Sequence, residues 1–383
     1  MTRPIPGRGI ALSDAQRVDW LRLIRSDNVG PVAFQQLINR YGSAGAALDA
    51  LPELVRRGGA RRAFRIADRA AVESEIATAE RMGARFVGLG EPDYPEALRA
   101  GDTPPPLLAI RGRASTAAGP CVGIVGSRNA SLAGTKLAGQ LAAAIGRSGY
   151  AVVSGLARGI DAAAHRASLG TGTVACMAGG LDKPFPPENV PLMEEIMERG
   201  GAVISEMPFG WQPRARDFPR RNRLIAGLSL GVLAVEAARR SGSLITARLA
   251  NEMGRLVFAT PGSPLDPRSA GTNALIKSGA TMVTEPADVI DALEPLRGGV
   301  PNAAQGRLLE ADPVAADADE AIATTERERI VEALGPTPVE VDELIVHVGA
   351  QPATVHMVLL ELELAGRLER HAGGLVSLVL ADA

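Results

Sequence analysis

The chain has 383 residues, 46% of them hydrophobic and 22% charged, and a formal net charge of −2. This composition excludes a disordered or fibrous protein, and the length predicts two or three domains with a sizeable core. Because the net charge is close to zero, a polyanionic partner must be bound by a local basic patch rather than by a generally basic surface.

The sequence predicts a cytoplasmic protein without a membrane span. Its first twenty residues lack the apolar run of a signal peptide, and no segment approaches the roughly 18–20 apolar residues of a membrane helix. Cys121 and Cys176 lie in separate predicted strands without a CxxC partner, so we expect buried, reduced thiols. The four histidines show no metal-ligand spacing, and we expect neither a metal nor a cofactor.

Residues 1–83 are predicted to form a small helical domain. The sequence "SDAQ" at 13–16 has the pattern of a capping box, and apolar residues recur at helical spacing in 18–24 and in 34–41. The two short helices meet at Val29-Gly30-Pro31 and could form a helix-hairpin-helix unit that offers backbone amides to phosphate. A single glycine favours a plain helical packing module instead.

Residues 84–296 are predicted to form a doubly wound, Rossmann-like α/β domain. A proline-rich stretch at 84–112 is interpreted as an extended lead-in to this domain. Seven apolar, β-branched runs from "CVGIVG" at 121–126 to "ATMVTE" at 280–285 then alternate with helical stretches. This alternation indicates a parallel sheet that helices cover on both faces.

Residues 297–324 lose this periodicity and are predicted to be a flexible linker. Residues 325–383 follow with three predicted helices and a hairpin, the order of a small winged-helix-like domain. This segment has four Arg and no Lys against ten Asp and Glu, a net charge of −6. Its third helix carries Glu361 and Glu363 and no basic residue before Arg367, which favours a protein-binding or structural role over duplex reading.

The carboxyl ends of the predicted strands are rich in glycine and small polar residues, so this rim of the sheet is the expected ligand site. In "GSR", Gly126 permits close backbone approach, Ser127 offers a hydroxyl and Arg128 a guanidinium fork to a phosphate. A tight turn with an exposed arginine is the alternative. Ser154 and Gly155 follow the next strand on the same rim. GxGxxG and GK[ST] patterns are absent, which argues against NAD and ATP.

Five arginines fall within residues 214–223, where a loop becomes an apolar helix. A helix start disfavours each cation by roughly 0.3–1 kcal/mol, so the cluster predicts an anionic partner. Arginines around an aromatic residue, here Phe218, are typical of single-stranded nucleic acid binding, in which a base stacks on the ring. The alternative is an internal salt-bridge network with Asp217, Glu206 and Glu236.

Asp161, His165 and Glu206 are the candidates for acid-base chemistry on this rim. A Ser154-His165-Asp161 triad can be drawn, but no GxSxG elbow supports it. Because His165 follows Asp161 by four residues, a local helix pair is favoured over catalysis.

Several motifs of residues 84–290 closely resemble, in consistent order, the DNA-processing protein A family of bacteria (DprA, also called Smf). They include "GIVGSR", "SGLARGIDAAAH", "GGLDKPFPPEN", "FPRRNRLIAGLS", "FATPGS" and "GTNALIKSGA". The N-terminal helices look like the family's sterile-alpha-motif or helix-hairpin-helix module, and the C-terminal segment looks like the winged helix of some members. One departure is Phe185, where the family commonly has tyrosine.

The resemblance implies a non-catalytic protein that binds and protects single-stranded DNA and helps load the RecA recombinase during natural transformation. It also implies a homodimer formed through the Rossmann-like domain. By motif position it implies DNA contacts for the residues Ser127, Arg128, Phe218, Arg220, Asn222 and Arg223. Arg221 is added from its charge, and Gly126, Ser154 and Gly155 from their place on the rim.

Two other functions stay open at this point. The first is a nucleotide-processing enzyme of the Lonely Guy phosphoribohydrolase type, for which the rim is suited but whose PGGxGTxxE signature is absent. The second is a scaffold that binds mainly protein, which the acidic C-terminal domain favours.

Overall fold

The computed structural model describes residues 11–60, 62–101, 103–297 and 324–379. The chain forms two compact units: unit 1 contains Ser74–Gly306 with Met1–Ala11, and unit 2 contains Leu12–Glu73 with Arg307–Ala383. The predicted linker lies almost entirely outside the described residues. Helix α4 (Arg69–Arg81) spans the boundary between the units along the chain.

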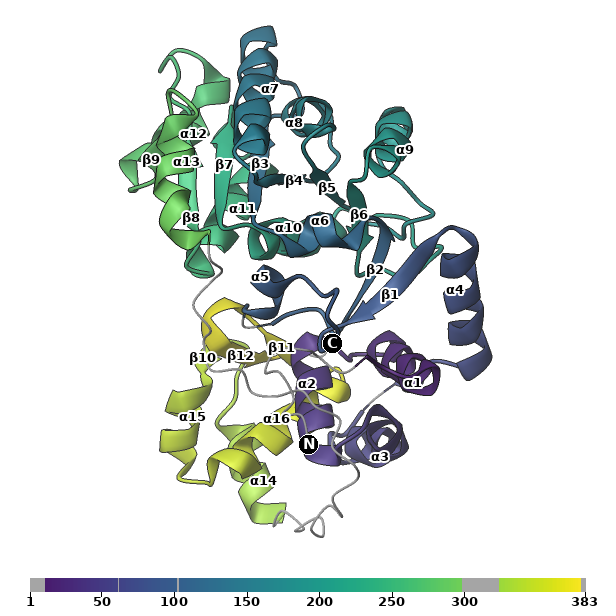
Figure 1. Ribbon diagram of the computed structural model, residues 1–383. Coiled ribbons are helices and arrows are strands. Elements are labelled where there is room, and N and C mark those ends of the chain that lie inside the picture. The colour runs from purple at the N-terminus through teal and green to yellow at the C-terminus, as the bar shows by residue number, and fades with distance from the viewer. Residues whose placement is uncertain (1–10, 61, 102, 298–323, 380–383) are drawn as a thin grey trace, which may run out of the picture. The chain divides into compact units, whose positions relative to one another are not determined.

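Unit 1 is built on a nine-stranded sheet with the order β1-β2-β6-β5-β4-β3-β7-β8-β9 (Figure 1). The seven predicted strands are confirmed and pair in parallel. They are β3 (Cys121–Gly126), β4 (Ala151–Ser154), β5 (Thr173–Cys176), β6 (Ala202–Ser205), β7 (Gly231–Val235), β8 (Leu256–Ala259) and β9 (Thr281–Met282). The β-branched residues of the central strands are buried on both faces, which explains the continuous apolar runs in the sequence.

The proline-rich lead-in contributes two further strands, which were not predicted from the sequence. β1 (Ala84–Gly88) pairs antiparallel with β2 (Leu107–Gly112), and β2 pairs antiparallel with β6. Tyr94 is buried in the loop between them, and its hydroxyl donates to the carbonyl oxygen of Pro105 at 2.7 Å. The sheet is therefore mixed, with an antiparallel edge on a parallel core.

Helices cover both faces of this sheet (Figure 1). α7 (Leu132–Arg147), α8 (Ile160–Ser168) and α13 (Ala287–Leu293) bury apolar side chains in one cluster with β3, β4 and β7. α10 (Asp217–Leu228) and α11 (Gly242–Glu252) pack together on the other face. The remaining helices of unit 1 are α5 (Glu96–Arg99), α6 (Ala114–Ala118), α9 (Val190–Glu198) and α12 (Ala270–Lys277). This arrangement confirms the doubly wound fold.

Unit 2 combines the N-terminal helices with the C-terminal segment. The N-terminal helices are α1 (Asp14–Arg25), α2 (Pro31–Tyr41) and α3 (Ala44–Arg57). The predicted capping box of α1 is present, with Ser13 and Gln16 bonded reciprocally at 3.2 and 2.9 Å. Phe34, Leu37 and Ile38 are buried on one face of α2, as predicted.

The C-terminal segment has the predicted three helices and hairpin. They are α14 (Thr324–Glu332), α15 (Val341–Val348), α16 (Pro352–Leu364), β11 (Leu368–Arg370) and β12 (Leu375–Leu378). A short strand, β10 (Val339–Glu340), pairs with β12 and completes a three-stranded sheet. Among the described residues no single helix is long and apolar enough to cross a membrane, although α15 and α16 together have that length and composition across a 119° bend.

Candidate nucleic-acid interface

A crevice opens in unit 1 at the carboxyl ends of β3 and β7, where the strand order reverses. β3 pairs with β4 on one side and with β7 on the other. Ligands of open α/β sheets bind at this position, because backbone amides and helix N-termini converge there. The crevice has a volume of about 630 Å³, and its walls come from residues 125–129, from α10 and from the turn before α11.

The loop after β3 supplies one wall. Gly126 is required because a Cβ at this position would overlap the carbonyl oxygen of Val235. Ser127 Oγ accepts the amide N–H of Asn129 at 3.2 Å, which turns the loop, and the side chain of Arg128 is exposed. The wall thus presents a hydroxyl and a guanidinium, two donors suited to phosphate.

Glu236 fastens this loop to the end of β7. Its carboxylate accepts the amide N–H of Ser131 at 2.8 Å and also the hydroxyl of Ser131. Ser131 in turn caps α7 by accepting the amide N–H of Gly134 at 2.9 Å. Glu236 has a φ of 50°, a conformation that costs free energy outside glycine and that clusters at functional sites. Glu236 therefore positions the loop and does not pair with the arginine cluster.

Phe218, in the first turn of α10, forms the opposite wall. Its half-buried ring lies 5.2 Å from the guanidinium carbon of Arg128 and 5.7 Å from that of Arg221. Phe185 meets it edge-on, with 5.9 Å between the ring centroids. The structure thus brings the "GSR" loop and the start of "FPRRNR" together in one crevice.

Arg221 is buried, with 6% of its surface exposed. Its Nη1 atom donates to the carbonyl oxygen of Gly155 and, at 2.9 Å, to that of Cys176, at the ends of β4 and β5. Burial lowers the pKa of Arg221, and the nearby charge of Asp161 opposes that shift. Arg221 therefore places a positive charge under the floor of the crevice rather than on its rim.

Arg220 and Arg223 bind the carboxylate of Glu206 at 2.9 and 2.8 Å. Glu206 is almost fully buried, and Arg223 also donates to the carbonyl oxygen of Thr103. Arg220 and Arg223 therefore form part of the internal salt-bridge network that was the alternative interpretation of the arginine cluster. Asp217 instead accepts from the Trp211 indole at 2.9 Å and from a backbone amide.

Ser154 and Gly155 lie at the carboxyl end of β4, on the predicted rim of the sheet, but they are buried beneath the crevice and do not line it. Ser154 is fully buried, and its hydroxyl donates to the carbonyl oxygen of Ile124 at 2.6 Å. Gly155 is buried against Arg221, whose guanidinium would overlap a Cβ at this position. Both residues shape the floor of the crevice.

The acid-base candidates are separated by their own hydrogen bonds. His165 Nδ1 lies 2.7 Å from the hydroxyl oxygen of Thr173, and burial lowers the pKa of His165 to about 3. Asp161 accepts two backbone amides after β4, at 3.1 and 3.3 Å, and burial raises its pKa. Among the described residues, His165 is hydrogen-bonded to neither Ser154 nor Asp161, so neither the triad nor the predicted local helix pair forms.

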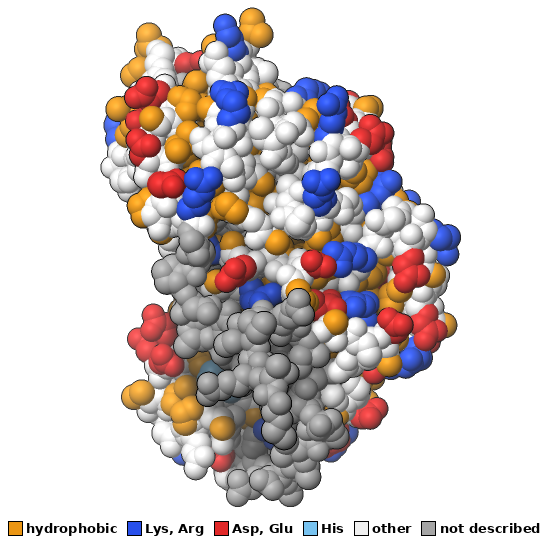
Figure 2. All heavy atoms as spheres, viewed as in Figure 1, with side chains coloured by type: hydrophobic (Ala, Val, Ile, Leu, Met, Phe, Trp, Pro, Cys, Tyr) orange, Lys and Arg blue, Asp and Glu red, His pale blue; other side chains and the backbone are white. Residues whose placement is uncertain are grey.

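The turn before α11 contributes a further wall; it is one of the small-polar loops of the predicted rim, although none of its residues was predicted to contact DNA. Arg240 is exposed there, and Ser241 caps α11 by accepting the amide N–H of Ser243 at 3.3 Å. A basic and small-polar run directly after β7 was the available signal. Elsewhere on unit 1, the face in Figure 2 shows Lys and Arg side chains spaced among apolar and acidic ones. This face of unit 1 is therefore mixed in charge and not uniformly basic.

Within the described part of the chain, no group of three or more His, Cys, Asp or Glu side chains is placed to hold a metal ion. Cys121 and Cys176 are buried and unpaired with one another, as predicted. Burial raises the pKa of the Cys121 thiol to about 12, so it is unreactive at neutral pH.

Three family models match the chain, and together they follow its three segments. A DprA-like N-terminal HHH domain matches residues 14–78, DNA recombination-mediator protein A matches 85–294, and a DprA winged helix domain matches 314–374. The chain belongs to the DNA recombination-mediator protein A family. This confirms the resemblance to the DNA-processing protein A family and the winged-helix assignment.

Relatives from several bacteria agree with this family membership. Protein Smf of Escherichia coli is 36% identical over 312 residues, which are 81% of this chain and 82% of that protein. A putative DNA processing protein DprA of Mycobacterium tuberculosis is 34% identical over 361 residues, 90% of this chain and 87% of that protein.

Two solved structures of DNA processing protein A relatives have the same fold. The Streptococcus pneumoniae protein superposes with a TM-score of 0.59 and 31% identity, over 74% of this chain and 98% of that one. The Helicobacter pylori protein, described for its single-stranded DNA binding mode, has a TM-score of 0.50 and 28% identity, over 55% and 95%.

The N-terminal match corrects one interpretation. The single glycine at residue 30 favoured a plain helical packing module, whereas the matching family model is an HHH domain. The structure shows why the sequence was a weak guide: Gly30 has an ordinary extended conformation, with φ −90°, as the N-cap of α2.

Proposed function

We propose that this member of the DNA recombination-mediator protein A family binds single-stranded DNA along the crevice of unit 1 and protects it, without catalytic turnover. The observation that carries the proposal is that the Arg128 guanidinium and the Phe218 ring lie 5.2 Å apart on facing walls. An arginine next to an aromatic ring can bind a phosphate while a base stacks on the ring, once the guanidinium moves off the ring face. The single-stranded DNA binding mode described for the Helicobacter pylori relative supports the same ligand.

The residues of the crevice divide into contact and support roles. Ser127 and Arg128, with the backbone of Gly126, bind phosphate, and Phe218 stacks a base. Asn222 lies on the wall, where its amide donates to the carbonyl oxygen of Gly242 at 3.3 Å and holds α10 against α11.

The remaining predicted residues support the crevice electrostatically or from below. Arg221 strengthens phosphate binding through its charge. Arg220 and Arg223 contribute less to binding, because Glu206 already neutralises part of their charge. Ser154 and Gly155 act only through the position of the crevice floor.

Family membership supports three further parts of the proposal. The bound strand is passed to the RecA recombinase, which the chain helps to load during natural transformation. A second copy of the chain binds through unit 1 to form a homodimer, and the protein works in the cytoplasm. We also propose functional domains at 1–83, 84–296 and 325–383, joined by a linker at 297–324, to which the three family matches correspond approximately.

A salt titration tests the proposal. Anisotropy of a labelled oligothymidine should show log affinity falling with log salt by about 0.7 per neutralised phosphate. Arg128→Ala should weaken binding and flatten the slope by about that amount. Arg199→Ala is the matched control, because Arg199 is exposed between α9 and the amino end of β6, on the rim opposite the crevice. Equal affinity and slope in the Arg128→Ala protein and the control would refute the assignment.

The enzymatic alternative is tested separately. Nucleoside monophosphates incubated with the protein should release no free base, since His165 and Asp161 are sequestered by other hydrogen bonds. Base release that Arg128→Ala abolishes would favour the phosphoribohydrolase hypothesis.

A further inference from the structure

Helix α16 of unit 2 is mostly apolar, and its few polar residues do not gather on one face. Its sequence, "PATVHMVLLELEL", contains no Lys or Arg, and eight of its 13 residues are buried. A helix that is hydrophobic on all sides is covered on all sides. A DNA-reading helix, by contrast, packs one face on its domain and presents the other to the major groove.

Two stripes of α16 are buried against different partners. The first stripe packs in the winged-helix core and consists of Val355, Val358, Leu359 and Leu362. The second stripe is buried outside that core and consists of Met357, Leu360, Glu361 and Leu364. The helix packs against α2 and α3, which come from the other end of the chain. The second stripe is the face that would otherwise be free to enter a groove.

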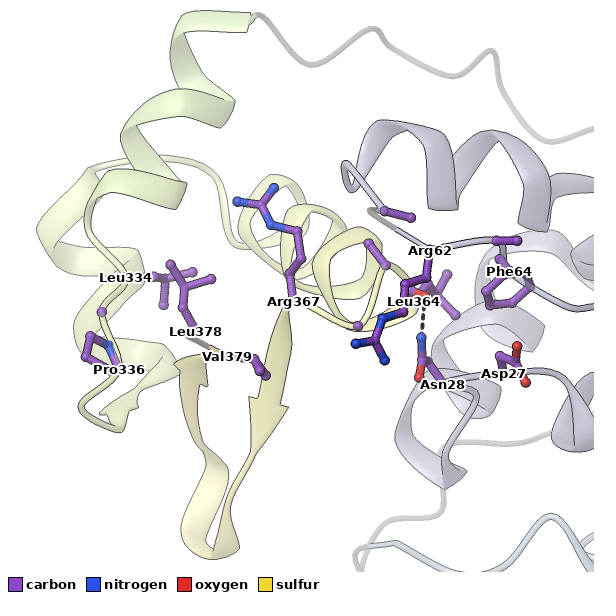
Figure 3. Close-up of a pocket in the computed structure, with 15 residues that line it drawn as sticks. Asp27, Asn28, Arg62, Phe64, Leu334, Pro336, Leu364, Arg367, Leu378 and Val379 are labelled. Carbon is purple, nitrogen blue, oxygen red and sulfur yellow. Dashed lines mark hydrogen bonds between the residues drawn. The ribbon is translucent and has the colours of Figure 1, made fainter. Parts of the chain in front are cut away.

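Hydrogen bonds between the two ends of the chain are directed at helix C-termini. Arg327 and Arg367 donate to the carbonyl oxygens of Arg57 and Gly58, at the end of α3, at 2.9 and 3.1 Å. In the opposite direction, the Asn28 amide donates to the carbonyl oxygen of Leu364, at the end of α16, at 2.9 Å (Figure 3). Donors at these positions satisfy carbonyl groups that have no partner within the helix. The positive charges of the two arginines also interact favourably with the negative end of the α3 dipole.

Glu361 places a negative charge in the contact between α16 and the N-terminal helices, hereafter the α16 junction. Its side chain is 1% exposed, and its carboxylate lies 2.7 Å from Arg327 Nη2. Arg327 therefore joins the buried acid of α16 to the end of α3. The other acidic residue of this helix, Glu363, is partly buried and pairs with Arg370 at 2.6 Å.

At Gly58 the end of α3 lies in close contact with the backbone of α16. Gly58 has a φ of −69°, a conformation that any residue adopts, yet a Cβ here would overlap the backbone carbonyl of Glu361. The glycine is thus required by the contact with α16 and not by the backbone of α3.

We propose that the second stripe of α16 is a protein-docking surface, occupied by the N-terminal helical module (residues 12–73) of the same chain. The winged helix consequently does not read duplex DNA, and the two ends of the chain work as one body. A cavity of about 790 Å³ marks the edge of this junction, with Phe64 and Arg62 from the N-terminal side and Leu378 and Val379 from the hairpin (Figure 3). This docking does not depend on the crevice of unit 1 or its ligand.

Hydrogen exchange of the full chain, followed by mass spectrometry, tests the docking. Gly58→Ala should accelerate exchange in peptides from α16 and the end of α3 by about tenfold or more, because the added methyl group overpacks the contact. Gly45→Ala is the control in the same helix, since its Cβ would lie 3.5 Å from the nearest atom. Unchanged exchange of α16 in Gly58→Ala would overturn the proposal.

A second variant covers the possibility that Gly58→Ala disturbs α3 itself. Asn28 has a φ of 56°, so Asn28→Gly keeps the backbone and removes only the amide bonded to Leu364. Asn28→Gly should also accelerate hydrogen exchange at the end of α16, by a smaller factor than Gly58→Ala does. Protection of α16 that is lost on dilution of the wild-type protein would mean that a second copy is the occupant, which would also overturn the proposal. Binding of single-stranded DNA should be unchanged in both variants.

Discussion

Arg128 and Phe218 lie on facing walls of the crevice, with the guanidinium carbon 5.2 Å from the ring centroid. The two residues come from the loop after β3 and the start of α10, so only the folded domain brings them together. An exposed cation–π contact contributes about 0.5–1 kcal/mol. This is small compared with the phosphate and stacking contacts that a bound strand would make, so the pair can open for a ligand.

Stacking and charge can be separated at Phe218. Phe218→Leu should weaken single-stranded DNA binding by about 5- to 150-fold, the equivalent of the 1–3 kcal/mol that a stacked base contributes. The salt slope should stay unchanged, because no charge is lost. Phe218→Tyr, which keeps the ring, should bind like the wild-type protein. Equal anisotropy titrations for the Leu and Tyr variants would show that no base stacks there.

Arg220 should contribute less to binding than its position in the motif suggests. Glu206 holds it at 2.9 Å and so offsets its charge. Arg220→Ala should therefore reduce the affinity and the salt slope less than Arg128→Ala does. An equal loss in the two variants would mean that DNA draws Arg220 away from Glu206.

Arg221 should matter first for stability. Arg221→Met leaves the carbonyl groups of Gly155 and Cys176 without their donor and Asp161 without a nearby positive charge. A buried carbonyl group left without its donor costs about 1–3 kcal/mol. Urea unfolding should show this loss, whereas Arg166→Met, at an exposed position on α8, should stay close to wild type. A stable Arg221→Met protein would contradict the structural role.

How far the sequence predicts this molecule depends on the range of each interaction. The parallel strands and the "GSR" turn follow from local patterns, and so were predicted. The pairing of Arg220 and Arg223 with Glu206 was only an alternative, because the acid follows a different strand and its choice of partner depends on the fold. β1 and β2 were missed because they are short and a proline-rich segment separates them, and because β6, the second partner of β2, is distant in the chain.

The α16 junction is an intermediate case. The sequence "TVHMVLLELEL" shows no polar face, and a helix without a polar face must pack against other elements on more than one side. Only the charges of Glu361 and Glu363 were interpreted from the sequence. The segment that packs on the second stripe of α16 could not be inferred from the sequence, because α3 lies near the opposite end of the chain.

His165 should make folding sensitive to acid. The unfolded imidazole binds a proton near pH 6.5, whereas burial lowers the pKa of the folded one to about 3. Between these values the unfolded state binds more protons, so stability falls as the pH falls, by about 2–3 kcal/mol at pH 4.5. His165→Asn keeps a donor toward Thr173, and its urea unfolding should lose that much less between pH 7 and pH 4.5. His347→Asn, at an exposed position, should follow the wild-type protein. The same pH dependence in both variants would contradict a neutral, buried His165.

Glu236 should control the order of the "GSR" loop. Its carboxylate binds the amide and the hydroxyl of Ser131, and it does so from a backbone conformation that costs free energy. Glu236→Gln weakens these charge-assisted bonds by about 1 kcal/mol, so DNA affinity should fall about fivefold. A merely global effect would raise hydrogen exchange everywhere, whereas a positioning role raises it in residues 127–134 alone. Glu252→Gln, at the end of α11, should change neither quantity, and a Glu236→Gln protein with normal exchange in the loop would show that the turn holds itself.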